Sequence, residues 1–102
     1  MNTQPQLSPS SVQYHITTDV HPGALSRVLQ IFELRGITPD LLKVRQYKQN
    51  SPISENLSID LHVSGLSETE EDVILQKILS QVCVQSVRKE NFFQRSQIRM
   101  VS

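Results

Sequence analysis

The chain has 102 residues and a mass of 11.6 kDa, which suits one domain and excludes an enzyme with a separate cofactor-binding domain. Ten basic and ten acidic residues give a formal charge of zero, so the chain lacks the basic excess that binding to nucleic-acid phosphates requires. All ten acidic residues lie between Asp19 and Glu90, whereas Arg95 and Arg99 make the C-terminal end basic. Composition therefore predicts no nucleic-acid partner.

The cysteine count and the lengths of the apolar runs indicate in which cellular compartment the protein is expected. Cys83 is the single cysteine, so the chain forms no internal disulfide and no multi-thiolate metal site, which suits a reducing compartment. No stretch approaches the ~18 apolar residues of a membrane span, and the N-terminus has no basic region followed by an apolar one. We predict a cytoplasmic protein without membrane contact, in which Cys83 is a small core residue.

The first half of the chain predicts a strand and a helix. Residues 1–11 are rich in Pro, Gln and Ser and are predicted to be a flexible lead. Apolar and polar residues then alternate over 12–19, the pattern of a half-buried strand. After Pro22-Gly23 the apolar residues follow helical spacing, and Gly36 ends the helix. The predicted buried stripe is Leu25, Val28, Leu29 and Phe32. Ile31 and Leu34 lie off this stripe and are predicted interface residues.

The second half predicts a hairpin, a helix and a last strand. Strands over 41–47 and 57–63 flank the turn-forming segment 49–52. Ser67 and Glu70 form a capping box for the second helix. The predicted stripe of this helix is Leu75, Ile78, Leu79 and Val82. Residues 82–87 return to a short strand.

The resulting βαββαβ order predicts an α+β fold, the ferredoxin-like sandwich, with two helices on one face of a four-stranded antiparallel sheet. We assign 1–11 to the lead, 12–90 to the domain and 91–102 to a C-terminal tail, which docks on a partner, frays or packs on its own domain. The open sheet face is predicted to carry His15, Thr17, Asp60 and His62, while Ile16, Ile59 and Leu61 lie under the helices.

No catalytic set can be assembled from the spacing, and no GxSxG motif occurs, so we predict a protein that is not an enzyme. His15 and His62 with Asp60 are the one combination that could bind a divalent metal, but a solvated polar face is the favoured interpretation, and we predict no metal site. An RNA-binding sheet would need aromatic residues on the open face of its central strands, and that face is predicted to carry His15 and His62 but no Phe, Tyr or Trp.

The strand-to-helix turn is the informative segment. Asp19 to Leu25 contains Gly23, where a ligand can approach the backbone, and the free N–H groups at the helix start can hold a carboxylate. From the residues alone, an amino-acid site and a plain tight turn remain equally open.

The run His-Pro-Gly-Ala-Leu-Ser-Arg-Val at 21–28, together with Phe32, Arg35-Gly36, Leu42 and Val44, resembles the ACT domain. Within that family, the run is most similar to the small regulatory subunit of acetohydroxyacid synthase (acetolactate synthase), in a short single-domain form. The resemblance covers about 12–89 and is more specific in its first half. It implies a homodimer that binds an amino acid between two domains, with valine, leucine or isoleucine as the expected ligand.

Carried over by position, the resemblance implies two groups of ligand-binding residues. One subunit would contribute His21, Gly23, Ala24 and Leu25, and the other would contribute Thr38, Pro39 and Asp40. Val20 stands where the family usually has Asp or Asn, and Thr38 stands where the regulatory subunits often have Asn. Loss of such a partner weakens binding by roughly 1 to 3 kcal/mol.

The resemblance implies a non-catalytic subunit that activates the catalytic subunit of the synthase. Thiamine diphosphate, flavin and Mg²⁺ would belong to that partner, and we expect no cofactor on this chain. An alternative is a free-standing ACT homodimer that senses another amino acid and regulates a different enzyme. An acylphosphatase-type hydrolase is a third class, but it would need an Arg in the first loop, and residues 19–24 contain none.

Overall fold

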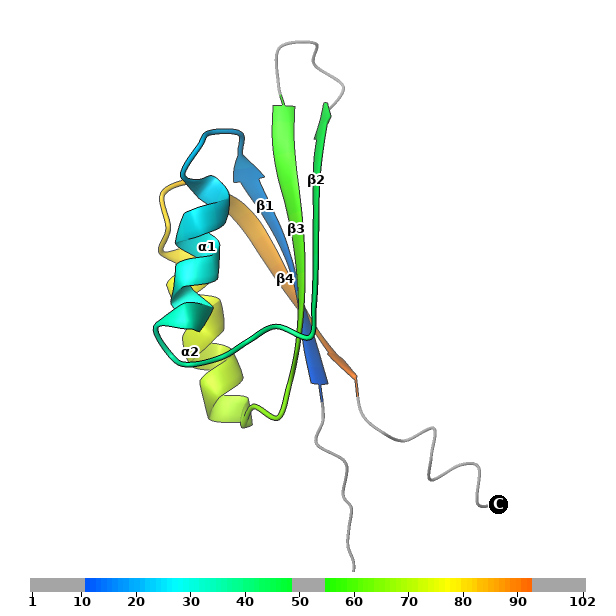
Figure 1. Ribbon diagram of the computed structural model, residues 1–102, viewed down its shortest axis with the longest axis vertical. Helices are drawn as coiled ribbons and strands as arrows, with labels where there is room; N and C mark the ends of the chain where they lie inside the picture. Colours follow the sequence, from blue (N-terminus) through cyan, green and yellow to red (C-terminus); the bar gives the residue numbers. More distant parts are fainter. Residues whose placement is uncertain (1–10, 49–54, 93–102) are drawn as a thin grey trace, which may run out of the picture.

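The computed structural model describes residues 11–48 and 55–92. The strands and helices follow the predicted βαββαβ order along the chain (Figure 1). They are β1 (Ser11–Asp19), α1 (Ala24–Glu33), β2 (Leu41–Lys48), β3 (Glu55–Ser64), α2 (Glu68–Leu79) and β4 (Val84–Phe92). Residues 1–10 of the predicted lead, the predicted turn at 49–52 and the tail from 93 onward lie outside the described residues. Ser11, assigned to the lead from sequence, is instead a buried residue at the start of β1.

The four strands form one antiparallel sheet in the order β2-β3-β1-β4, and both helices cover the same face (Figure 1). This arrangement confirms the predicted ferredoxin-like sandwich and the predicted β2–β3 hairpin. β1 and β3 are central because each has a hydrogen-bonded strand on both sides, whereas β2 and β4 form the edges.

The strand register assigns each side chain to a face. His15 pairs with Asp60 and Ile16 pairs with Ile59, so alternate positions face the helices and the open side, as predicted. Most buried apolar side chains come from the helix face of β1 and β3 and from the inner sides of the helices. They form one core of Val12, Tyr14, Ile16, Val28, Ile31, Phe32, Ile59, Leu61, Val63, Ile74 and Ile78.

Helix α1 buries a wider face than its predicted stripe. Val28 and Phe32 are buried as predicted, and Phe32 meets the ring of Tyr14 edge to face at 5.8 Å. The interface prediction for Ile31 is wrong, because its side chain is only 7% exposed and belongs to the core. Leu34, the other predicted interface residue, is 79% exposed at the end of the helix.

Helix α2 begins at the predicted capping box. Ser67 Oγ accepts a hydrogen bond from the Glu70 N–H, and the Glu70 carboxylate accepts one from the Ser67 N–H. The predicted stripe is wrong at its C-terminal end, because Leu79 is 47% and Val82 is 92% exposed. Ile78 is buried as predicted and Leu75 packs against the core, but the inner face continues through Ile74 and the side chain of Glu71, so the buried stripe lies closer to the N-terminus of α2.

Glu71 is buried because β4 supplies polar partners for it. Asn91 donates a hydrogen bond to the Glu71 carboxylate at 2.9 Å, and the Lys89 ammonium lies 3.5 Å from the same oxygen. Tyr14 donates from its hydroxyl to the backbone carbonyl of Glu71 at 2.9 Å. The polar groups beneath α2 are therefore paired, as burial of a charge requires.

Two ionisable groups in this cluster have shifted pKa values. Burial raises the pKa of the Tyr14 phenol well above its usual value, and the negative charges of Glu71 and Asp72 raise it further. The hydrogen bond to Asp72 raises the pKa of the Lys89 ammonium group, although partial burial opposes the rise. Both groups therefore keep their protons more strongly in the folded chain than in the unfolded chain.

Strand β4 is longer than the predicted segment 82–87. It starts at Val84 and ends at Phe92, so Asn91 and Phe92, assigned to the tail from sequence, are strand residues. A bulge opposite Thr17 and Thr18 shifts the β1–β4 register. The charged run of β4 obscures its alternation, because the polar ends of Lys89 and Asn91 face α2 while Arg88 and Glu90 occupy open-face positions. Cys83 is buried just before this strand, as predicted.

Neither described helix is long and apolar enough to cross a membrane.

Candidate functional site

The turn between β1 and α1 presents an uncapped helix N-terminus. The His21 imidazole accepts a hydrogen bond from the Gly23 N–H at 3.2 Å, and the His21 carbonyl accepts one from the Ala24 N–H at 3.1 Å. Within the described residues, the N–H groups of Leu25 and Ser26 have no acceptor, and the first turn carries no acidic side chain. This end of α1 therefore has free donors and a positive helix dipole for an anionic group.

Gly23 leaves room at this turn without requiring an unusual backbone. Its φ of −92° is accessible to other residues. A Cβ built at Gly23 would lie 3.4 Å from Arg27 Nε and 3.6 Å from His21 Cε1, so a side chain there would contact two flexible groups. A larger residue at Gly23 would therefore require Arg27 or His21 to shift slightly.

Asp19, one place before Val20, takes part in a hydrogen-bonded group on the open sheet face. Asp19 shares the open sheet face with its partner Asn56 and accepts a hydrogen bond from Gln85 at 2.7 Å. Gln85, which lies at the bulge of β4, also donates to Asn56 Oδ1 at 2.8 Å and so connects Asp19 and Asn56 to that strand. Val20 is 39% exposed at the start of the turn. The position before the turn therefore carries a partly exposed apolar side chain, and Asp19 is engaged by Gln85.

The second predicted segment, Thr38 to Asp40, connects α1 to β2 at the other end of the helix (Figure 1). The Asp40 carboxylate accepts a hydrogen bond from Ser64 Oγ at 2.5 Å, and the Asp40 N–H donates to the His62 carbonyl at 2.7 Å. Thr38 is exposed and Pro39 is half-buried. These contacts fix the segment against the end of β3.

Within one chain, the two predicted groups of ligand-binding residues are far apart. Leu41 pairs with His62, which pairs with Gln13, so the 38–40 segment enters the sheet at the level of Gln13. The β1–α1 turn starts after Asp19, six positions further along β1, which corresponds to about 20 Å. One copy therefore does not bring the two groups together.

The free edge of β2 provides a geometry that could bring them together between two copies. A second copy whose β2 pairs antiparallel with this β2 is inverted, so its 38–40 segment lies at the end that carries the first copy's β1–α1 turn. Leu42 and Val44 lie on the helix face of β2 but are 42% and 39% exposed, because the helices do not cover this edge. The sequence pattern predicted interface residues only on α1, at Ile31 and Leu34, because it does not show which strand lies at the sheet edge.

The two histidines on the open sheet face, His15 and His62, have hydrogen-bond partners within the same face. His15 lies with Nδ1 2.8 Å from Asp60 and Nε2 2.9 Å from Glu90, so the two carboxylates flank the ring on opposite sides and do not converge on a common point. His62 contacts Ser11 Oγ at 3.1 Å. The described residues contain no group of three metal-ligating side chains suited to an ion.

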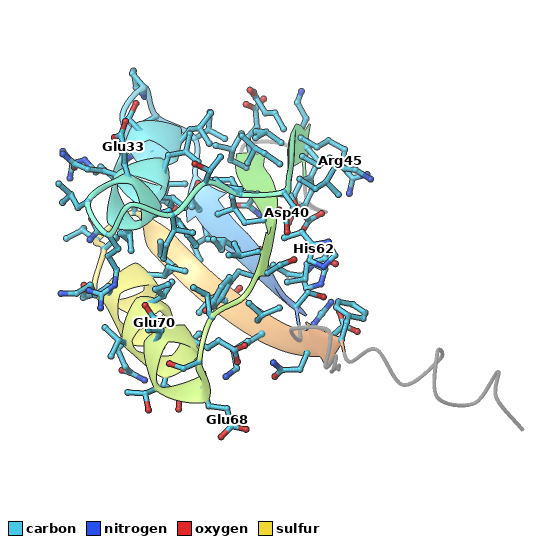
Figure 2. All side chains as sticks on the ribbon, turned by 60° about the horizontal axis from the view of Figure 1, so that its bottom comes forward. Glu33, Asp40, Arg45, His62, Glu68 and Glu70 are labelled. Carbon is cyan, nitrogen blue, oxygen red and sulfur yellow. The ribbon has the colours of Figure 1, made fainter. Side chains whose placement is uncertain are left out.

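The open face carries aromatic residues that were not expected there. Tyr47 pairs with Asn56, and Phe92 pairs with Ser11, which assigns both side chains to the open face of the edge strands. The Phe92 ring lies against that of His62 at 5.6 Å. Arg45 and His62 project from the side of the sheet away from the helices (Figure 2). Among the described residues, the edge strands of this face therefore carry Tyr or Phe side chains, and the central strands carry none.

Comparison with known proteins agrees with this architecture. Residues 6–96 match the ACT-like domain family. No curated protein matches the chain by sequence. The crystal structure of the ACT domain from the GTP pyrophosphokinase of Chlorobium tepidum has a TM-score of 0.63 at 9% identity, covering 78% of this chain and 96% of that one.

Two further structures share the fold. The C-terminal domain of the MgtC protein from Mycobacterium tuberculosis has a TM-score of 0.61 at 14% identity, covering 89% of this chain and 96% of that one. The regulatory subunit of aspartate kinase from Thermus thermophilus has a TM-score of 0.56 at 18% identity, covering 80% of this chain and 50% of that one. At these identities the similarity defines the fold alone.

The chain therefore belongs to the ACT-like domain family. ACT domains are regulatory modules that bind amino acids, and this places the chain in a class of regulatory domains.

Proposed function

We propose that the chain is a regulatory subunit of acetohydroxyacid synthase that acts as a homodimer and binds a branched-chain amino acid between its two copies. The observation that carries this proposal is the uncapped start of α1 in the run from His21 to Val28, where two backbone N–H groups lack acceptors among the described residues. A ligand carboxylate would bind those donors, with the backbone of Gly23 and Ala24 beside it.

Specificity in this site would come from both copies. Leu25 is half-buried next to the free donors and would contact an aliphatic side chain of the ligand. Thr38, Pro39 and Asp40 of the partner copy would close the site from the other side. Because the inverted β2–β2 arrangement is required for this closure, ligand binding and dimer formation would stabilise each other.

Regulation would follow from that coupling. The dimer would activate the catalytic subunit of the synthase by contact, and a bound valine, leucine or isoleucine would shift the equilibrium by the usual coupling free energy of ~1 to 3 kcal/mol. Thiamine diphosphate, flavin and Mg²⁺ are assigned to the catalytic subunit, and this chain would contribute no reacting group.

The first experiment measures the thermal midpoint of the purified chain with each of the twenty amino acids at millimolar concentration. A ligand present at 100 times its dissociation constant adds about 2.7 kcal/mol, which raises the midpoint of a domain this size by roughly 10 to 20 °C. We expect a selective rise with a branched-chain amino acid. A selective rise with another amino acid would favour the free-standing sensor, and no rise would contradict ligand binding.

Gly23→Asp tests the location of the site. The new carboxylate would occupy the free donors and repel the ligand's carboxylate, while the backbone at Gly23 accepts the residue, so the selective rise should vanish in a folded protein. Thr69→Asp, which adds the same charge to the exposed first turn of α2, is the matched control and should keep the response.

A second experiment tests the partner. The catalytic subunit from the same cell, assayed alone and with this chain, should gain activity in the presence of the chain. An unchanged rate together with a selective ligand response would assign the chain to a different target enzyme.

A further inference from the structure

A hollow between the outer sides of α1 and α2 has no role in the proposed function. Its volume is about 390 Å³, at the lower end of the range for small-molecule sites. α1 and the turn after it contribute one wall, and the C-terminal end of α2 contributes the other. We call it the interhelical groove, and its lining residues are Arg27, Gln30, Ile31, Leu34, Arg35, Lys77, Ser80 and Gln81.

The groove gathers positive charge around an apolar floor. Arg27 and the buried Ile31 lie four residues apart on one side of α1, and Arg35 lines the groove from the turn that follows the helix. Lys77 faces them from α2. No acidic residue lines the groove, although the chain as a whole has as many acidic as basic residues.

These three cations have no anionic partner in the part of the chain that the structure describes. The ion pairs there involve His15, Lys48 and Lys89, and no side-chain hydrogen bond of Arg27, Arg35 or Lys77 occurs. Like charges that line one groove without a counter-charge repel one another, and a bound anion reduces that repulsion.

The negative end of the α2 dipole also lies at the groove, and local hydrogen bonds reduce its effect. The Lys77 carbonyl accepts hydrogen bonds from Ser80 Oγ at 2.7 Å and from Gln81 Nε2 at 3.4 Å. A half-charge at a helix end is smaller than three whole charges, so the field in the groove remains positive.

We infer that the interhelical groove binds a phosphorylated small molecule, with the phosphate held by Arg27, Arg35 and Lys77 and the carbon skeleton on Ile31 and Leu34. Guanidinium groups bind phosphate through paired N–H donors, and the groove is larger than one phosphate ion, which leaves room for an organic portion over the apolar floor. Gln30 and Gln81 supply neutral donors and acceptors beside that portion.

The site is separate from the proposed amino-acid site, yet Arg27 connects the two. Arg27 Nε lies 3.4 Å from the position of a Cβ at Gly23, so the same side chain borders both the groove and the β1–α1 turn. A phosphate that draws Arg27 into the groove would move it relative to the turn.

The test is a titration of the full ¹⁵N-labelled chain, followed by NMR, with adenosine monophosphate, inorganic phosphate and malonate at constant ionic strength. We expect saturable binding of the nucleotide, shifts centred on amides of α1 and the end of α2, and weaker binding of inorganic phosphate. Binding of malonate or inorganic phosphate as tight as that of the nucleotide would overturn the assignment to a phosphate ester, and so would the absence of saturable nucleotide binding.

Paired variants locate the site. Arg27→Gln with Lys77→Gln should weaken nucleotide binding at least about tenfold. Lys43→Gln with Arg45→Gln removes the same charge from the open sheet face and should change the affinity less than about twofold. Equal losses in both pairs would show attraction by net charge alone and would overturn the site. Circular dichroism of each variant checks that the fold is retained.

Discussion

At the scale of single residues, the polar contacts beneath α2 determine how stability depends on pH. Tyr14 is fully buried yet donates a hydrogen bond to the Glu71 carbonyl, and Lys89 connects Glu71 to Asp72. The pKa values of Tyr14 and Lys89 are both raised in the folded chain. The folded state therefore holds protons that the unfolded state loses first as the pH rises.

The contribution of these two groups to the free energy of unfolding should be constant through neutral pH. It should fall above about pH 10, where the tyrosine of the unfolded chain ionises. Tyr14→Phe removes one of the two groups with a raised pKa, so the free energy of unfolding of this variant should fall less steeply at high pH. Loss of the hydrogen bond to Glu71 should lower its free energy of unfolding by about 1 kcal/mol at neutral pH. Urea unfolding from pH 7 to 11 measures both effects. Tyr47→Phe, which removes a phenol outside the core, is the control, and an equal change in that variant would contradict the assignment to Tyr14.

A second residue-scale prediction concerns Val20. Val20→Asp places a carboxylate at the start of the β1–α1 turn, where it could pair with the amino group of a bound amino acid. The gain expected from one charged hydrogen bond is roughly 1 to 3 kcal/mol, or about 5- to 150-fold in affinity. Isothermal titration with valine measures it. Unchanged affinity in Val20→Asp would argue against ligand binding at this turn, and Val82→Asp controls for the added charge.

At the scale of secondary-structure elements, sequence patterns predicted correctly those features that depend only on residues close together in the sequence. The alternation in β1 and β3 and the capping box at Ser67 predicted their elements correctly, because one strand face or one helical turn determines each. The stripe of α2 was wrong because Glu71 is buried through Asn91 and Lys89, which are distant in sequence. The interhelical groove was missed for the same reason, since it exists only when two helices lie side by side.

The capping box predicts how much stability is lost when the Ser67 hydroxyl is removed. Ser67→Ala removes the acceptor for the Glu70 N–H and should lower the free energy of unfolding by about 1 kcal/mol. Thr69→Ala removes an exposed hydroxyl in the first turn of the same helix and should be nearly neutral. Urea unfolding compares the two variants, and similar losses would contradict a specific capping role for Ser67.

At the scale of the whole molecule, the β2 edge is the surface on which the proposed dimer depends. Leu42 and Val44 are partly exposed on the helix face of β2, and no described strand pairs with the outer side of β2. If the two predicted segments bind one ligand, their placement at opposite ends of the fold would require a second, inverted copy. The resemblance predicted the two segments, but only the strand register shows their separation.

If β2 forms the dimer interface, the thermal midpoint should rise with protein concentration. Leu42→Lys with Val44→Lys places two charges at the interface in each copy and should give a monomer whose midpoint is independent of concentration. Sedimentation equilibrium provides the direct measurement. Val82→Lys alters an apolar side chain that is 92% exposed elsewhere and should leave the dimer intact. A variant at Leu42 and Val44 that stays dimeric would exclude this interface.

The pairing of Ser11 with Phe92 has a consequence for how the chain reaches its fold. Because β1 and β4 are adjacent, the ends of the described unit meet at one end of the sheet (Figure 1). A circular permutant that joins these ends and opens the chain between β2 and β3 would retain every strand pair. β4–β1 would then be a local hairpin and β2–β3 the distant contact, so the order of loop closure during folding would reverse while the native topology stayed the same.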